Sequence, residues 1–218
     1  MPICLEVWGD YACFTRPEMK TERVSYDVMT PSAARGILEA IFWHPGLVWR
    51  IDRIHVLNPI RFTNIRRNEV KSTLSASKAK TVMEHGNGDL YLIASQDIQQ
   101  RAAMVLCDVR YVIEAHFDMT EKAALSDNPG KFQDMIKRRI IRGQCYHPPY
   151  FGCREFPAHF AMCDHIPECP EELIGYRDLS YMLWDMDYTD PQNIRPLFFR
   201  AELNHGILDI PLREEVIG

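Results

Sequence analysis

Two segments with clear helix-start signals divide the strand-like parts of this chain, and their positions restrict the folds that it can adopt. Thr30 precedes Pro31, and Asn128 precedes Pro129. Short polar side chains cap helices at the amino end, and proline is favoured at the first helical position. Apolar residues recur at helical spacing after both signals. The sequence therefore predicts two helices, at about 31–43 and 129–142.

Alternating apolar and polar residues predict strands around these helices. One strand pattern precedes the first helix, two lie between the helices, and a weaker one follows the second. Strand, helix, strand, strand, helix, strand is the order of the ferredoxin-like fold, which is also the order of RNA-recognition domains. This order alone supports many functions. Two further strand patterns close the chain, the last being a hairpin that turns near 204–206.

The chain has 218 residues, which is enough for one large domain or two small ones. We expect an α+β protein: a ferredoxin-like (RNA-recognition-like) domain over residues 1–145, followed by a small C-terminal antiparallel β-sheet domain over residues 146–218. Length also allows a sizeable apolar core without disulfides or metal ions to support it.

Residues 60–97 interrupt the regular pattern of the first domain. They are polar, rich in Ser, Thr and Asn, and predict a long structureless insertion, which is usually either functional or disordered. The insertion is locally basic, with only Glu69 as an acid between positions 61 and 80. Either it is a solvated loop or it is an arm that nucleic acid orders. Its cations are Arg61, Arg66, Arg67, Lys71, Lys78 and Lys80.

The second predicted helix carries another group of cations. The net charge of −5 argues against a general polyanion binder, so local clusters carry the argument for nucleic-acid binding. On its own this cluster would suggest a solvated helix face, but together with the basic insertion it favours contact with phosphates. Aromatic side chains such as Tyr11 and Trp43 could stack on bases, although most aromatic residues belong to cores. The helix cations are Lys137, Arg138, Arg139 and Arg142.

Several classes of site are disfavoured by the sequence. Seven cysteines at irregular spacing predict reduced thiols in the cytosol, and the Cys and His residues between 145 and 169 lack paired zinc-ligand spacing. We therefore expect no metal and no cofactor. No nucleotide-binding glycine motif or nucleophile elbow is present. Without a signal-peptide pattern or a long apolar run, we expect a cytoplasmic protein with no membrane partner.

Arg110, Glu114 and His116 share one face of a predicted strand. Alternate residues of a strand point to the same side of a sheet, so these three side chains should lie close together. A solvated sheet face is the favoured interpretation, and a catalytic group is the alternative.

Seven segments of this sequence occur in the same order as in a known family. They are VWGDYACFTRPEMKTERVSYDVMTPSAARGILEAIFWHP, RIHVLNPI, RRNEV, YVIEAHF, DNPGK, GCREFPA and PLFFRAEL. Together they resemble the type I-C (Dvulg) CRISPR-associated protein of Cas family five, subtype d, a member of the repeat-associated mysterious protein (RAMP) superfamily. The resemblance runs nearly end to end.

The resemblance implies an endoribonuclease that cuts the CRISPR repeat transcript at its hairpin without a metal ion. A ribose 2′-oxygen attacks the adjacent phosphate, leaving a cyclic phosphate and a 5′-hydroxyl. It also implies that the protein stays on the 5′ handle of the mature guide RNA, beside other subunits of the type I-C interference complex. The alternative is a structural subunit that binds the RNA handle with weak or no cleavage.

The family pattern places Tyr or His at the position of Phe42, and Lys followed by His at Lys131 and Phe132. Of these three family groups, this chain has only the lysine, Lys131. Phe42 and Phe132 have no exchangeable proton and cannot act as acid or base. His44 replaces a family lysine. We predict that Lys131 stabilises negative charge on the phosphorane and that His44 is the candidate base. The alternative for His44 is an exposed histidine at a helix end with no catalytic role. Predicted RNA contacts are Arg66, Arg67, Lys71, Lys78, Lys80, Lys137 and Arg138.

Overall fold

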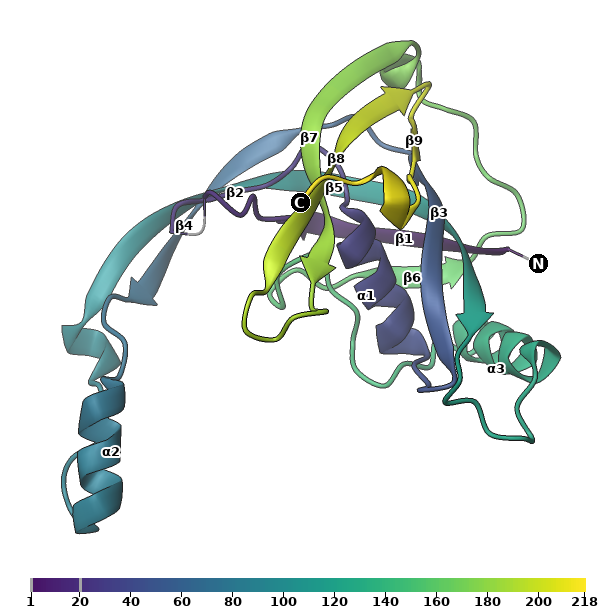
Figure 1. Ribbon diagram of the computed structural model, residues 1–218. Coiled ribbons are helices and arrows are strands. Elements are labelled where there is room, and N and C mark those ends of the chain that lie inside the picture. Colours follow the sequence, from purple (N-terminus) through teal and green to yellow (C-terminus); the bar gives the residue numbers. More distant parts are fainter. Residues whose placement is uncertain (1, 20) are drawn as a thin grey trace. The chain divides into compact units, whose positions relative to one another are not determined.

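The computed structural model describes residues 2–19 and 21–218 and shows an α+β protein with an antiparallel sheet (Figure 1). The helices are α1 (Pro31–Ile41), α2 (Ala76–His85) and α3 (Pro129–Ile141), with short 3₁₀ turns at Ala94–Gln96, Glu171–Leu173 and Arg213–Glu215. The strands are β1 (Ile3–Ala12), β2 (Arg23–Val24), β3 (Leu47–Val56), β4 (Phe62–Val70), β5 (Ile98–Met119), β6 (His159–Met162), β7 (Tyr176–Asp187), β8 (Arg195–Asn204) and β9 (Ile207–Asp209).

Both predicted helix starts are confirmed. The Thr30 hydroxyl accepts a hydrogen bond from the Ala33 N–H at 3.3 Å, and the Asn128 side chain accepts one from the Lys131 N–H at 2.9 Å. Helix α1 ends slightly earlier than predicted, because Phe42 already has an extended backbone. The apolar stripe of each helix is buried, as its spacing predicted: Ile37, Leu38 and Ile41 in α1, and Phe132, Ile136 and Ile140 in α3.

Strands run across the described part of the sheet in the order β6-β1-β5-β3-β9-β8-β7, with β2 and β4 pairing with β5 outside this path. In the β1–β5 pair, Leu5 lies opposite Ile113 and Val7 lies opposite Tyr111, and all four side chains are buried. One face of β5 is therefore apolar and buried against β1. Along β3 the register shifts between Ile51 and Arg53, so its side chains do not alternate strictly between the two faces.

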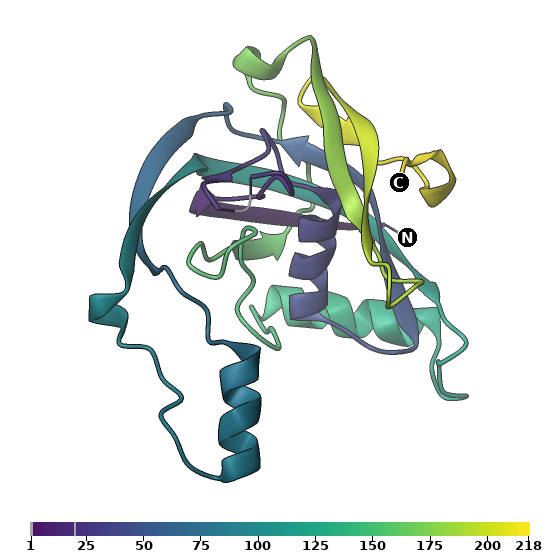
Figure 2. The same ribbon diagram turned by 60° about the vertical axis from the view of Figure 1, so that its left-hand side comes forward.

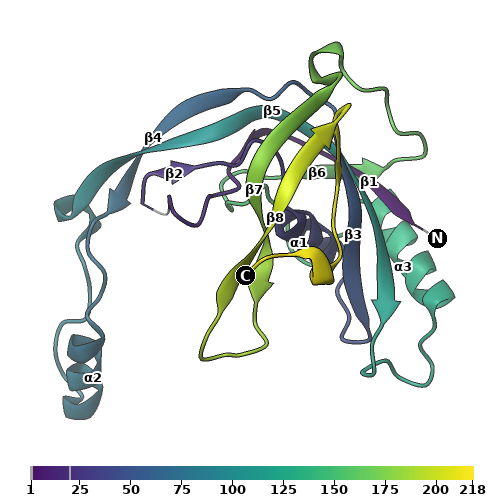
Figure 3. The same ribbon diagram turned by 45° about the horizontal axis from the view of Figure 1, so that its top comes forward.

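Helices α1 and α3 contact each other near the sheet. Helix α1 contacts β3 and β7, and α3 contacts β6 and α1. Figure 2 shows α3 running close to the end of α1, and Figure 3 shows the β7–β8 hairpin passing over α1. The predicted closing hairpin is confirmed between β8 and β9, where His205 and Gly206 both have positive φ.

The chain forms two compact units, one comprising residues up to 63 together with 104–218, the other comprising residues 64–103. In the larger unit, β9 joins the C-terminal strands to β3 within the same sheet. The domain boundary expected near residue 145 stays a prediction.

The predicted structureless insertion is wrong for most of its length. It contains β4, α2 and the beginning of β5. Ser75 caps α2 at its amino end, and Gly86 ends it in the left-handed conformation at φ 68°. Side chains of β4 alternate between exposed and half-buried, and six of its nine residues are polar, with Phe62, Ile65 and Val70 divided between the two faces. A strand of that kind lacks the apolar alternation from which strands are predicted.

Candidate functional site

The carboxyl end of α1 and the amino end of α3 meet over a cluster of aromatic side chains. The ring centroids of Phe42 and Phe132 are 5.9 Å apart, and Phe132 is 6.2 Å from Phe117 of β5. Trp49 of β3 packs on Phe117 and donates its indole N–H to the Phe42 carbonyl at 3.0 Å. Phe42 and Phe132 are only 2% and 1% exposed. These two positions therefore form a buried floor.

Polar side chains lie along the edge of this floor. The His44 ring centroid is 4.9 Å from that of Phe132, and the Lys131 Nζ lies 2.8 Å from Asp127 Oδ1. His44 Nε2 lies 4.0 Å from the other oxygen of the same carboxylate. The structure thus brings together Lys131, His44, Phe42 and Phe132, as the predicted site requires.

Asp127 joins the two polar side chains and was not predicted as a site residue. Its side chain is 5% exposed, whereas that of Lys131 is 44% exposed. The Lys131 ammonium and the Ala124 N–H both donate to its carboxylate, and together they hold the pKa of Asp127 below its ordinary value. An acid four residues before a lysine at a helix start is a visible sequence signal for such a pair.

The orientation of His44 limits its chemistry. Its Nδ1 accepts a hydrogen bond from the Gly46 N–H at 3.0 Å. An acceptor nitrogen carries no proton, so the neutral ring holds its proton on Nε2, the atom nearest Asp127. A general base at Nε2 needs that nitrogen unprotonated, which conflicts with the Gly46 contact. In this geometry His44 is a hydrogen-bond donor.

The first turn of α3 offers fewer backbone donors to an anion than expected. Pro129 has no N–H, and the N–H groups of Lys131 and Phe132 both bond to Asn128. The attraction for a phosphate therefore rests chiefly on the ammonium charge of Lys131.

The predicted RNA-contacting cations of residues 64–103 divide into two groups. Arg66, Lys71 and Lys78 are exposed. Arg67 is half-buried and lies 3.5 Å from Glu69, and Lys80 lies 3.8 Å from Glu84 one helical turn away. Lys80 is also exposed, at 79% of its side chain, but an ion-paired cation has less charge to offer a phosphate, so Arg66, Lys71 and Lys78 are better suited to contact RNA.

The cations of α3 also differ in their surroundings. Lys137 and Arg138 are exposed. Arg139 turns inward, donating to the Ile41 carbonyl at 2.8 Å and placing its guanidinium 5.1 Å from the Phe42 ring centroid. Arg139 therefore helps to hold the end of α1 against α3.

The three charged side chains predicted to share a face of β5 are each paired with a neighbouring strand. Arg110 binds Glu6 at 2.7 Å, and His116 binds Asp52 at 2.8 Å. Glu114 forms a short contact with His55. Cross-strand pairing of this kind is a structural arrangement.

No disulfide joins cysteines within the part of the chain that the structure describes. Burial raises the pKa of the Cys163 and Cys169 thiols. Within residues 2–19 and 21–218, no group of three His, Cys, Asp or Glu side chains is placed to hold a metal ion. None of the described helices combines the length and the apolar composition needed to span a membrane.

Comparison with known proteins gives consistent matches. Residues 3–211 match the family described as CRISPR-associated protein (Cas_Cas5). The CRISPR pre-crRNA endoribonuclease Cas5d of Mannheimia succiniciproducens is 53% identical over 96% of this chain and 94% of its own. The Cas5d endoribonuclease of Thermus thermophilus is 38% identical, covering 95% and 90%. A crystal structure of a CRISPR-associated protein shares the fold at a TM-score of 0.70 and 20% identity, covering 100% of this chain and 97% of its own.

The Asp127 pair predicts a dependence of stability on pH. Because the folded-state pKa of Asp127 is lowered, its carboxylate stabilises the fold above the ordinary aspartate pKa of about 3.9, and that contribution is lost as the pH falls through the lowered value. We expect urea unfolding to show the wild type more stable than Asp127→Asn at pH 6, with the difference shrinking towards pH 3. Asp134→Asn, an exposed aspartate of α3, is the control. A difference that stays constant down to pH 3 would contradict this assignment.

Proposed function

Because the chain belongs to the Cas5d family of CRISPR-associated proteins, we propose that it is a CRISPR pre-crRNA endoribonuclease. The observation that carries the proposal is 53% identity over nearly the whole length of a relative with that activity. The substrate is then the repeat RNA of its own CRISPR array. We further propose that it keeps the mature guide RNA within the type I-C interference complex.

The strand order supports a ferredoxin-like RAMP domain. Strands β1, β3, β5 and β6 lie side by side as β6-β1-β5-β3, with α1 following β1 and α3 following β5. Two interleaved strand-helix-strand units of this kind define the ferredoxin-like arrangement. Because β6 spans His159–Met162, the proposed domain extends beyond residue 145.

The proposed reaction forms a bond between the ribose 2′-oxygen and phosphorus and breaks the bond from phosphorus to the 5′-oxygen. The 2′-hydroxyl gives up its proton to solvent water, extra negative charge develops on the phosphorane oxygens, and the leaving 5′-oxygen takes up a proton. The Lys131 ammonium can serve the last two needs, because it carries protons and 44% of its side chain is exposed. The Asp127 carboxylate at 2.8 Å offsets part of its charge, but this contact engages one of three N–H groups and leaves the others for a phosphate. No metal ion takes part in these steps.

Asp127 is the proposed positioning residue for Lys131. A lysine side chain alone has many rotamers, and the 2.8 Å contact to a buried carboxylate restricts its Nζ to one region above the aromatic floor. His44 adds its Nε2–H beside the same carboxylate. His44 is therefore proposed as a donor to the phosphate rather than as the base.

A second candidate function is supported by the same site. Phe42 and Phe132 are packed together without a proton to exchange, and His44 has its Nδ1 engaged. A site with charge but no base would bind and hold RNA while cutting it slowly. That is the behaviour of a structural subunit bound to the RNA handle.

Cleavage of the repeat RNA in EDTA, with analysis of the product ends, tests the first proposal. We expect a cyclic phosphate and a 5′-hydroxyl. Lys131→Ala should lower the cleavage rate by about 100-fold or more, the usual effect of removing a group that stabilises transition-state charge, and should leave RNA affinity within a few-fold. Lys122→Ala, an exposed lysine in the preceding loop, is the matched control. Equal rates for Lys131→Ala and wild type would misplace the site, and tight binding without any cleavage would favour the second candidate.

Restoring the family's groups tests whether the buried floor can take part in chemistry. Phe42→Tyr together with Phe132→His places a hydroxyl and an imidazole where both positions are almost fully buried. A buried polar group without a partner costs about 1–3 kcal/mol, so we expect lower stability in urea and no gain in rate. An increased rate in the double variant would show that these positions do reach the scissile bond.

The exposed cations of residues 64–103 predict a salt dependence. Each phosphate contact contributes roughly 0.7 to 0.9 to the slope of log affinity against log salt, so Arg66→Ala with Lys71→Ala and Lys78→Ala should lower the slope by about 2 to 3. The control removes three cations that are each paired with an acid, Arg50, Arg53 and Arg200. Equal slopes for the two triple variants would reject the RNA contacts.

A further inference from the structure

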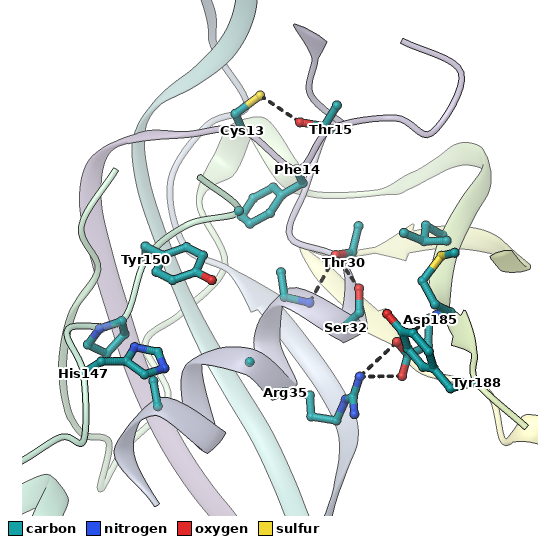
Figure 4. A pocket seen from close by; sticks show the side chains of 17 residues that line it. Cys13, Phe14, Thr15, Thr30, Ser32, Arg35, His147, Tyr150, Asp185 and Tyr188 are labelled. Atoms are coloured by element: carbon teal, nitrogen blue, oxygen red, sulfur yellow. Dashed lines mark hydrogen bonds and ion pairs between the residues drawn. The ribbon is translucent and has the colours of Figure 1, made fainter. Parts of the chain in front are cut away.

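A cavity beside α1 is not used by the proposed cleavage site. Its volume is about 530 Å³, within the range of roughly 300–1,000 Å³ usual for ligand pockets. Its walls come from one side of α1, from residues 13–15, from residues 147–152 and from the second half of β7 (Figure 4). Lys131, Asp127 and His44 are not among its lining residues.

The lining combines flat rings with polar groups. The Tyr150 ring lies on one side with its hydroxyl directed into the cavity, and the His147 ring lies nearby, its centroid 6.3 Å away at an interplanar angle of 27°. On the other side are the hydroxyls of Thr30 and Ser32, 3.2 Å apart. Unpaired nucleobases are bound by this combination of stacking rings and hydrogen-bonding groups.

The charged residues of the wall disfavour a phosphate. Arg35 is the cation that faces the cavity, and its guanidinium lies 2.7 Å from Asp185 and 3.5 Å from Glu39. Two acids therefore offset its charge. An ion pair of this kind presents both donors and acceptors, which suits the polar edge of a base better than an anion.

Gly36 leaves room for an occupant at the α1 wall of the cavity. It lies in the middle of α1, where alanine would favour the helix, and it lines the cavity. A Cβ built there meets no atom within 4 Å, so packing within the protein does not require glycine. The missing side chain leaves the backbone of α1 open to the cavity at this position.

We propose that this cavity holds the base of an unpaired nucleotide of the repeat RNA. The proposal rests on the RNA-binding function proposed above. Ala40 lines the cavity two residues before Phe42, and its carbonyl accepts the Tyr146 N–H at 2.8 Å, which ties the wall segment 147–152 to the end of α1. The bound nucleotide would therefore lie a short distance along the RNA from the cleavage site, where it could set the cut position.

Photocrosslinking tests the assignment directly. Repeat RNAs carrying 4-thiouridine at one unpaired position each are bound to the full-length protein, irradiated and digested, and the crosslinked peptides are identified by mass spectrometry. We expect one position to crosslink to the peptide containing residues 147–152. Gly36→Leu, which places a bulky side chain in the cavity, should remove that crosslink and weaken RNA affinity by roughly tenfold, the usual loss when one stacked base is displaced.

Gly36→Ala should weaken the crosslink less, and it should unfold at the same or a higher temperature than wild type because alanine favours helices. Gln192→Leu adds the same side chain to an exposed loop and is the control for bulk. Wild-type RNA binding without a crosslink to 147–152, or unchanged affinity in a folded Gly36→Leu, would overturn the cavity assignment alone. A crosslink without cleavage would overturn only the nuclease proposal, and absence of RNA binding would overturn both.

Discussion

The contact between Phe42 and Phe132 is the constraint on which the candidate site depends. It joins the end of α1 to the start of α3, and Phe117 and Trp49 extend it to two strands of the sheet. The indole N–H of Trp49 also satisfies the Phe42 carbonyl, which the end of a helix would otherwise leave unpaired. Lys131 and His44 come from distant parts of the chain, and they lie beside one carboxylate because the rings beneath them are packed.

Because of this contact, Phe42 and Phe132 contribute packing to the site and take no part in proton transfer. The resemblance implies proton-transferring groups at these two positions in the family, whereas here both are apolar and almost fully buried. What the site keeps is charge: an ammonium fixed by Asp127, with a histidine N–H beside it. Charge stabilisation and proton transfer are separate contributions to catalysis, so a site can lose one and keep part of its rate.

Much of the fold could be predicted from the sequence because its signals are local. Thr30-Pro31 and Asn128-Pro129 specify helix starts whatever surrounds them, and the alternation in β5 shows its buried face. Residues 64–103 escaped prediction because β4 is mostly polar on both faces, so pairing with β5 rather than burial makes it a strand. The site residues Lys131, Phe42 and Phe132 were predicted by resemblance, not by pattern. The function of the Gly46 N–H in fixing His44 depends on three-dimensional contact and leaves no trace in the sequence.

Pairing, more than net charge, determines which surfaces of an acidic protein can meet RNA. Arg35, Arg50 and Arg110 each lie within 3.2 Å of a carboxylate, so most of their charge is already offset. Arg66, Lys71 and Lys78 are exposed, and no ion pair to an acid is found for them among the described residues. Counterion release depends on cations that a phosphate can approach, so these few residues can outweigh a net charge of −5. The same reasoning applies at the cavity, where the pairing of Arg35 with Asp185 favours a neutral base over a phosphate. Affinity for the RNA backbone would then come from the unpaired cations of residues 64–103. Selection of a base would come from the cavity, where the cation is paired with an acid.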